Sequence, residues 1–325
     1  MRFSIIIFCI CFFYSCNLKI EYKKVNPFFI SKKELVSVKY FSDEILHPDF
    51  MTRIGNILVI SSTKSDSMLF YYHLPDMKLI EKTGRKGNAA DEFHAFPMFC
   101  HSQTNNTLYI WGYTPITIKK FTLNNEKDLE QIKTYNVSYE SFNYMHVIKD
   151  SLLVYYLPDN LEIKKINLEN NVLLDQINLK KDSHNESFFY SNRGMIIAND
   201  SSIVHSYLFK RRIDIYDIET LKLKTVIGDT NNKVNIVEED FNNVRYYYVN
   251  LVAGEKYFYA LYSGKNNQED PTGSKNKIEV YDYEGNPIIE YTFDIPPLLY
   301  TIDEKNQMIY GFNNFYEDYL LSYKM

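Results

Sequence analysis

The most regular pattern along the chain is a hairpin of two strands in which apolar and polar residues alternate. Five copies begin at Leu69, Ile118, Ile163, Ile213 and Ile278, and Pro, Asn, Asp or Gly occupies the turn in nearly every copy. Another hairpin precedes each copy, and its second strand is the most hydrophobic part of the unit: Ile57–Ile60, Leu108–Trp111, Leu152–Tyr156, Ile203–Tyr207, Tyr257–Tyr262 and, once more, Met308–Phe312. Each unit thus holds four antiparallel strands in roughly fifty residues, a repeat that predicts the blade of a β-propeller.

The number of blades follows from the two ends of the repeat. Five units are complete, whereas a sixth has its third strand at residues 319–323 and lacks a fourth strand. An alternating strand at residues 36–41 precedes the first complete unit and has no partner of its own. Pairing these two strands completes the sixth blade and removes an exposed edge. The sequence therefore predicts an all-β, six-bladed propeller with four-stranded antiparallel blades, closed by residues 36–41 and 319–323.

The N-terminus has the pattern of an export signal. Arg2 precedes an apolar run from Phe3 to Tyr14, which is too short to span a bilayer as a helix. Cys16 follows the run directly and resembles the acylated cysteine of a bacterial lipobox, although Phe13 stands where Leu is usual. We expect a signal peptide at 1–15, a lipidated Cys16 with a polar tether at 16–34, and one propeller domain at 35–325. A plain signal peptide with an incidental cysteine, or an uncleaved anchor, is the alternative.

Composition narrows the class of partner. The chain has 45% hydrophobic and 24% charged residues, a net charge of −5 and no basic tract, which argues against nucleic acid as a partner. Of four cysteines, three lie in the first sixteen residues, so neither a disulfide framework nor a metal-binding cysteine spacing is present. We expect the membrane to be a partner through the lipid anchor, in the bacterial cell envelope and at the outer membrane.

An acidic residue meets an aromatic residue at most joints between units. The instances are Asp49-Phe50, Glu92-Phe93, Glu140-Ser-Phe142, Glu186-Ser-Phe188 and Asp240-Phe241. In one reading the Phe wedges between blades and the carboxylate accepts backbone N–H groups. In the other, several carboxylates converge on the mouth of the central channel and hold a cation such as Ca²⁺. Both readings stay open at this point, and so does the presence of a metal.

One joint carries the sharpest motif, Gly84-Arg-Lys-Gly-Asn-Ala-Ala-Asp-Glu-Phe93. It resembles the Gly-Arg-Gly-x-Gly-x-Glu-Phe signature of TolB-like six-bladed propeller lipoproteins, which bacteria export. The copy departs from that signature at Lys86 and at Ala89-Ala90. The resemblance implies the same fold and an exported location, and it implies no particular chemistry.

Ligand-binding residues are expected on the face that carries the joints and the loops between second and third strands. The candidates are Arg85, Lys86, Asp91, Glu92, Tyr113, Arg211 and Arg212. Tyr113, Arg85 and Arg211 suit a carbohydrate or a peptide carboxylate. The long segment from Ser263 to Lys277 reaches the same face, and long loops on rigid scaffolds often carry recognition.

No catalytic constellation appears in the sequence. The seven histidines lack metal-binding spacing, and there is no Gly-x-Ser-x-Gly elbow. We therefore predict a membrane-tethered, non-enzymatic binding module for a peptide, a glycan or a partner protein, with no cofactor. The alternatives are a glycosidase or lyase that uses carboxylates or histidines at the channel mouth, and a structural subunit of an envelope complex.

Overall fold

The computed structural model describes residues 22–42, 44–45, 47–101, 106–124, 128–137, 143–179, 192–230 and 243–325. The predicted signal peptide and the predicted lipidation site Cys16 lie outside these residues. Strands dominate the described ranges, where no helix has both the length and the apolar character that a membrane span requires.

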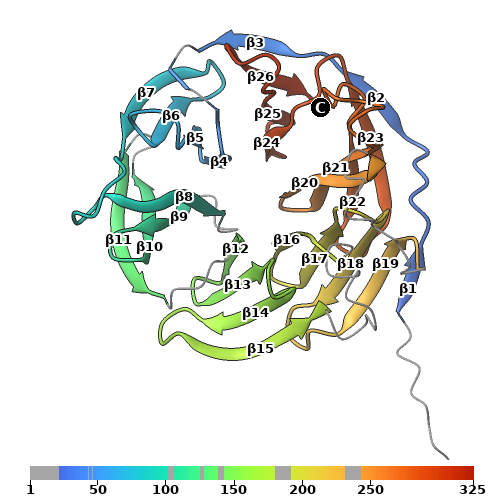
Figure 1. The fold of residues 1–325 in the computed structure, drawn as a ribbon, viewed down its shortest axis with the longest axis horizontal. Helices are drawn as coiled ribbons and strands as arrows, with labels where there is room; N and C mark the ends of the chain where they lie inside the picture. Colours follow the sequence, from blue (N-terminus) through green and yellow to red (C-terminus); the bar gives the residue numbers. More distant parts are fainter. Residues whose placement is uncertain are drawn as a thin grey trace, which may run out of the picture.

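Six blades surround a central axis (Figure 1). Blade 1 holds β4 (Phe50–Ile54), β5 (Ile57–Ser61), β6 (Leu69–His73) and β7 (Lys78–Thr83). Blade 2 holds β8 (Phe93–His101), β9 (Thr107–Tyr113), β10 (Thr117–Asn124) and β11 (Asp128–Asn136). Blade 3 holds β12 (Asn143–Ile148), β13 (Leu152–Leu157), β14 (Glu162–Asn167) and β15 (Val172–Asn178). Blade 4 holds β16 (Gly194–Ala198), β17 (Ser202–Tyr207), β18 (Arg212–Asp217) and β19 (Leu223–Gly228). Blade 5 holds β20 (Tyr246–Ala253), β21 (Tyr257–Lys265), β22 (Lys277–Asp282) and β23 (Pro287–Phe293). Blade 6 holds β24 (Leu299–Asp303), β25 (Met308–Phe312) and β26 (Tyr319–Lys324), with β3 (Val38–Phe41) as its fourth strand.

The hydrophobic second strands are explained by packing between blades. In β13, Leu153 belongs to the core cluster shared with blade 2, whereas its neighbour Val154 belongs to the cluster shared with blade 4. Successive side chains of a strand point to opposite faces, so a strand that is covered on both faces needs apolar residues at every position. We call the interface between two adjacent blades a seam.

The predicted closure of the ring is confirmed. β3 pairs antiparallel with β26, with Phe41 opposite Tyr319 and Val38 opposite Ser322. β3 thus supplies the fourth strand of blade 6, whose other three strands are β24, β25 and β26.

The segment before β3 differs from the expected tether. β1 (Lys23–Val25) pairs in parallel with β19, and β2 (Lys32–Leu35) pairs in parallel with β23. Residues 22–35, which we call the strap, therefore lie along the outer edges of blades 4 and 5 (Figure 1). Residues 22–34 do not form a free polar tether, because their backbone extends two sheets of the propeller and the side chain of Phe29 is buried between blades.

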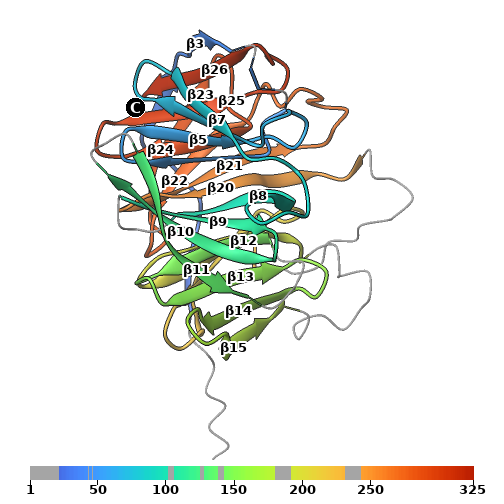
Figure 2. The same ribbon diagram turned by 90° about the vertical axis from the view of Figure 1, so that its left-hand side faces the viewer.

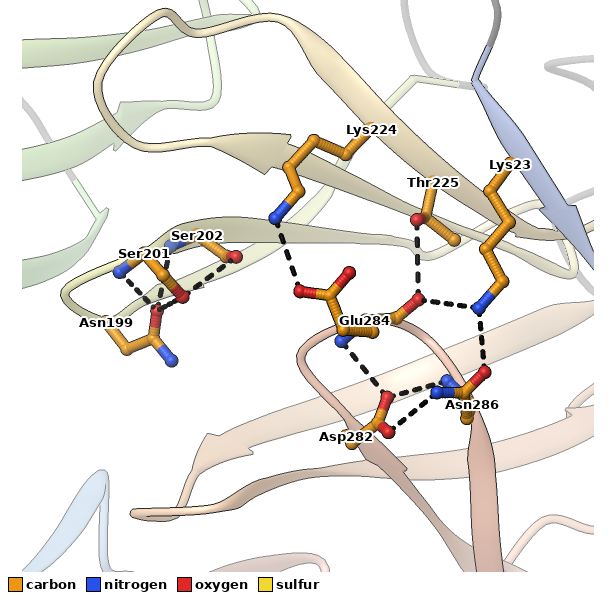
Figure 3. A network of polar contacts seen from close by, with 9 residues as sticks. All are labelled: Lys23, Asn199, Ser201, Ser202, Lys224, Thr225, Asp282, Glu284 and Asn286. Carbon is orange, nitrogen blue, oxygen red and sulfur yellow. Dashed lines mark hydrogen bonds and ion pairs between the residues drawn. The ribbon is translucent and has the colours of Figure 1, made fainter.

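Polar contacts fix the strap to both blades (Figure 3). Lys23 in β1 donates to the side chain of Asn286 at 2.7 Å and to the carbonyl of Glu284 at 3.3 Å. Gly285 in the same turn has φ of 86°, and a Cβ there would lie 2.8 Å from Thr225 of β19. The turn of blade 5 therefore approaches blade 4 closely, and the strap lies across the place where the two blades meet.

Candidate functional site

The centre of the ring is narrow and mainly apolar. The inner strands enclose a cavity of about 130 Å³, lined by residues such as Met51, Met98 and Met145. The Nε2 atom of His146 lies 3.2 Å from the carbonyl oxygen of Ile196 in the neighbouring blade. Among the described residues, no carboxylate lines this cavity.

The carboxylates at the described joints accept backbone hydrogen bonds. Asp49 accepts one from Thr63 at 2.7 Å, and Glu92 accepts one from Ala89 at 2.9 Å. The joints at 140–142, 186–188 and 240–241 lie outside the described residues. Within the part of the chain that the structure describes, no group of three or more His, Cys, Asp or Glu side chains is placed to hold a metal ion. At these two joints the geometry matches the structural reading of the acidic–aromatic pair.

A larger cavity opens in the seam between blades 1 and 2 and has a volume of about 350 Å³. We call it the seam cavity. Blade 1 contributes residues of β5 to β7, and blade 2 contributes residues of β8 to β11. The lining that matters below is Tyr71, Glu81 and Thr83 of blade 1, and Phe93, Tyr113, Lys119, Phe121 and Gln131 of blade 2, together with Asp91 of the joint.

A lysine and two aromatic rings form one wall of the seam cavity. The ammonium group of Lys119 lies 3.9 Å from the ring centroid of Tyr113 and forms an ion pair with Asp91. The rings of Phe93 and Tyr113 stack with their centroids 4.2 Å apart. Only 8% of the Lys119 side chain is exposed, so its charge relies on Asp91 and on the face of the Tyr113 ring.

The tyrosines of the cavity stay protonated over the physiological pH range. Burial raises the pKa of Tyr113, and the charge of Asp91 raises it further. Burial likewise raises the pKa of Tyr71, with a smaller contribution from the charge of Glu81. Both phenols are therefore neutral hydrogen-bonding groups beside the charged groups of Glu81, Asp91 and Lys119.

The glycine-rich joint forms the edge of the seam cavity. Gly84 has φ of 79°, and a Cβ on it would lie 2.7 Å from the ring of Phe93, so a larger residue there would press on the cavity wall. The backbone N–H of Phe93 donates to the carbonyl of Arg85 at 2.8 Å, which folds the joint back on itself. The side chains of Arg85 and Lys86 are exposed and form no hydrogen bond or ion pair with the described residues.

The structure does not bring all the predicted ligand-binding residues together. Asp91 and Tyr113 line the seam cavity, and Arg85, Lys86 and Glu92 belong to the joint beside it. Arg211 and Arg212 belong to blade 4, with blade 3 between them and the seam cavity. The expected grouping of Tyr113, Arg85 and Arg211 therefore does not form one site.

Arg211 and Arg212 also point into different seams. Arg212 donates two hydrogen bonds to Asp214, at 2.6 and 2.9 Å, and is largely buried. Burial alone would lower the pKa of Arg212, but the hydrogen bonds and charge of Asp214 outweigh it, so its pKa is raised. Arg211 lies 3.7 Å from the buried Glu279 of blade 5 and 5.0 Å from the ring centroid of Tyr262. Both arginines balance buried carboxylates.

The long loop after β21 is closed by its own side chains. Asn266 accepts the backbone N–H groups of Gln268 and Glu269, and Asp270 accepts those of Ser274 and Lys275. Such turns order the loop without using a partner.

Sequence reasoning missed Tyr71, Glu81, Lys119 and Gln131 in the cavity wall. They lie on four different strands that only the propeller brings together. A weak indication existed for Lys119, which is the third residue of the third strand of blade 2. Blades 4 and 5 have acidic residues, Asp214 and Glu279, at the same position.

Comparison with known proteins supports the fold. A solved structure from Bacteroides fragilis NCTC 9343, of a protein named on the assumption that it is exported, superposes with a TM-score of 0.56 at 12% identity, and the match covers 93% of this chain and 99% of that chain. Raptor of Chaetomium thermophilum gives a TM-score of 0.48 at 10% identity, over 82% of this chain and 22% of that chain. A search of curated proteins found no match. The family model described as TolB-like 6-blade propeller-like matches residues 26–305, and the chain therefore belongs to the TolB-like six-bladed propeller family.

Proposed function

We propose that the protein is a non-enzymatic binding module of the bacterial envelope that takes a segment of a peptide or partner protein into the seam cavity. The observation that carries this proposal is the composition of the cavity wall. Stacked aromatic rings, neutral phenols, a lysine and two carboxylates surround a volume of about 350 Å³. Such a mixture of apolar surface and a few placed polar groups is typical of recognition sites.

The state of each polar group favours binding over catalysis. The ammonium group of Lys119 is engaged within the site, in an ion pair with Asp91 and against the ring of Tyr113. Tyr71 and Tyr113 have raised pKa values and keep their protons. A general base needs a pKa near the working pH, and burial moves the pKa of both phenols away from that range.

Export and lipid anchoring belong to the same proposal. The apolar run after Arg2 and the position of Cys16 support it, and so does the resemblance to exported propellers of the same family. Metabolic labelling with a fatty-acid analogue in a bacterial host tests the anchor. We expect label on the wild-type protein and none on Cys16→Ser, with the variant released from the membrane fraction. Label that persists in Cys16→Ser would refute lipidation at this residue.

Binding is tested by screening the full-length protein against peptide and glycan arrays and against solubilised envelope proteins. Gln131→Trp places a large ring in the cavity from an outer strand. Ile132→Trp adds the same ring at the neighbouring exposed position, which does not line the cavity, and serves as control. Ligands lost in the first variant and kept in the second support the proposal. Turnover of a screened compound, abolished by Gln131→Trp, would replace it with an enzymatic function.

A further inference from the structure

The strap shows how an outer edge of this propeller accepts an extended segment. Lys23 pairs with Thr225, and Val25 pairs with Ile227, on the outer strand of blade 4. Four residues after Val25, the side chain of Phe29 is buried in the core cluster of the seam between blades 4 and 5. Its ring meets that of Tyr281 edge to face, with centroids 5.2 Å apart. The strap thus behaves as a built-in peptide ligand with one aromatic anchor.

The outer strand of blade 1 corresponds to the outer strand of blade 4. In blade 4, Ile213 pairs with Ile227 and Ile215 pairs with Thr225. In blade 1, the residues at the same places are Leu69 paired with Thr83 and Tyr71 paired with Glu81. β7 therefore presents the edge that β19 presents to the strap. Along the described chain, no strand covers the edge of β7 (Figure 2, where this rim faces the viewer).

The seam cavity corresponds to the place that Phe29 fills. The third strands of blades 2 and 5 can be aligned, because Ile118 pairs with Trp111 as Ile278 pairs with Leu261. Phe121 and Tyr281 each lie three residues further along, so Phe121 corresponds to Tyr281. The cavity is lined by Phe121 and by the blade 1 counterparts of three residues that share a core cluster with Phe29. These counterparts are Leu69 for Ile213, Tyr71 for Ile215 and Thr83 for Ile227. One seam of the ring is thus filled by an aromatic residue of the strap, whereas the corresponding seam has a cavity.

The charges at the empty edge define the ligand further. Glu81 of β7 occupies the position that corresponds to Thr225 of β19, the residue that pairs with Lys23 of the strap. Glu81 is exposed and makes no ion pair within the described residues. A cationic residue at the place of Lys23 would therefore meet a carboxylate. Gln131 and Glu81 also offer hydrogen bonds to a hydroxyl group on an aromatic ring that enters the cavity.

We propose that the seam between blades 1 and 2 binds an extended segment of a partner protein that pairs in parallel with β7, with a basic residue opposite Glu81 and an aromatic side chain, six residues further on, in the seam cavity. This inference rests on the proposed binding function and specifies its ligand. The affinity comes from backbone pairing, and the selectivity comes from the pocket and the charge.

A peptide with the sequence of residues 22–30 tests the inference directly. We expect fluorescently labelled peptide to bind full-length protein, purified in detergent, with one site per chain. Gln131→Trp is expected to weaken binding at least tenfold, and Glu81→Lys several-fold, whereas Ile132→Trp leaves it unchanged. Replacing the residue that corresponds to Phe29 with Ala in the peptide is expected to cost at least tenfold.

Each contrary outcome has a distinct meaning. Peptide binding that Gln131→Trp leaves intact would overturn the inference, because the peptide would then exchange with the strap or bind elsewhere. A dimer that dissociates in Gln131→Trp would assign the site to a second copy of the chain and overturn the assignment to a partner protein. An absence of peptide binding, with array ligands still lost in Gln131→Trp, would overturn the inference and leave the binding function standing. An absence of both would overturn both.

Discussion

Phe41 lies opposite Tyr319 in the strand pairing that closes the ring, and the two rings meet edge to face with centroids 6.1 Å apart. This pair joins residues that are nearly the whole chain apart in sequence. The propeller is therefore a closed structure in which the last blade is incomplete until the N-terminal strand arrives.

The strand pairing of β3 with β26 should contribute strongly to the free energy of unfolding. Leu320 pairs with Tyr40 and is buried in the core between blades 6 and 1. Leu320→Ala is expected to lower the free energy of unfolding by about 2–5 kcal/mol, because it leaves a cavity in a packed core. Leu174→Ala is the control, since Leu174 is half exposed on β15 and should cost less than about 1 kcal/mol. Equal losses in urea unfolding would contradict this role for the closure.

Two adjacent phenylalanines of the strap should differ sharply in their contribution to stability. Phe29 is 5% exposed and Phe28 is 69% exposed. Phe29→Ala is expected to destabilise the protein by about 3 kcal/mol and Phe28→Ala by about 0.5 kcal/mol or less. Hydrogen exchange in β1 and β19 would show whether the strap opens in the first variant alone. Equal protection in both variants would mean that Phe29 does not anchor the strap.

The buried ion pair in blade 4 should be sensitive to the loss of one partner. Asp214→Asn leaves the guanidinium of Arg212 buried without its counter-charge, and we expect a loss of about 3–5 kcal/mol in the free energy of unfolding. Glu169→Gln removes the partner of Lys133 in an exposed pair and should cost less than about 1 kcal/mol. A double variant, Arg212→Met with Asp214→Leu, should recover much of the first loss if the unpaired charge is its cause.

His205 should make the fold acid-sensitive. Burial, reinforced by the charges of Arg212 and Lys210, lowers its pKa from 6.5 to about 3. Between these values the unfolded chain binds a proton that the folded protein does not, so stability falls as the pH falls from 6.5 toward 3. From pH 7.5 to pH 5 we expect a loss of about 2 kcal/mol from this residue. His205→Phe should flatten the profile, whereas His94→Gln at an exposed site should leave it unchanged.

The repeat determined most of the fold in advance. Hairpins with polar turns and apolar second strands predicted the blades, and one surplus strand with one missing strand predicted the closure. β1 and β2 were missed because Lys23, Lys24, Lys32 and Lys33 make them look like a solvated tether. Parallel pairing with distant strands leaves no hairpin pattern. The only local indication was the apolar spacing of Val25, Phe29 and Leu35.

The site was less predictable, for a physical reason. A cavity between blades is lined by strands that are far apart in sequence, so its composition follows from the seam and not from any motif. Asp91 and Tyr113 were found because they flank turns. Arg211 and Arg212 were grouped because they are adjacent in sequence. In the structure they form ion pairs with carboxylates in different seams, Arg211 with Glu279 and Arg212 with Asp214.

The strap also sets where the propeller would be attached to a membrane. If Cys16 is acylated as we propose, five residues separate it from Tyr22, and the six residue steps between them reach at most about 20 Å. Since β1 lies along the outer edge of blade 4, the lipid would lie within that reach of this part of the rim (Figure 1). In a ring of six, the seam between blades 1 and 2 is diametrically opposite the seam that Phe29 fills. The seam cavity would then lie on the side of the ring opposite the point of attachment.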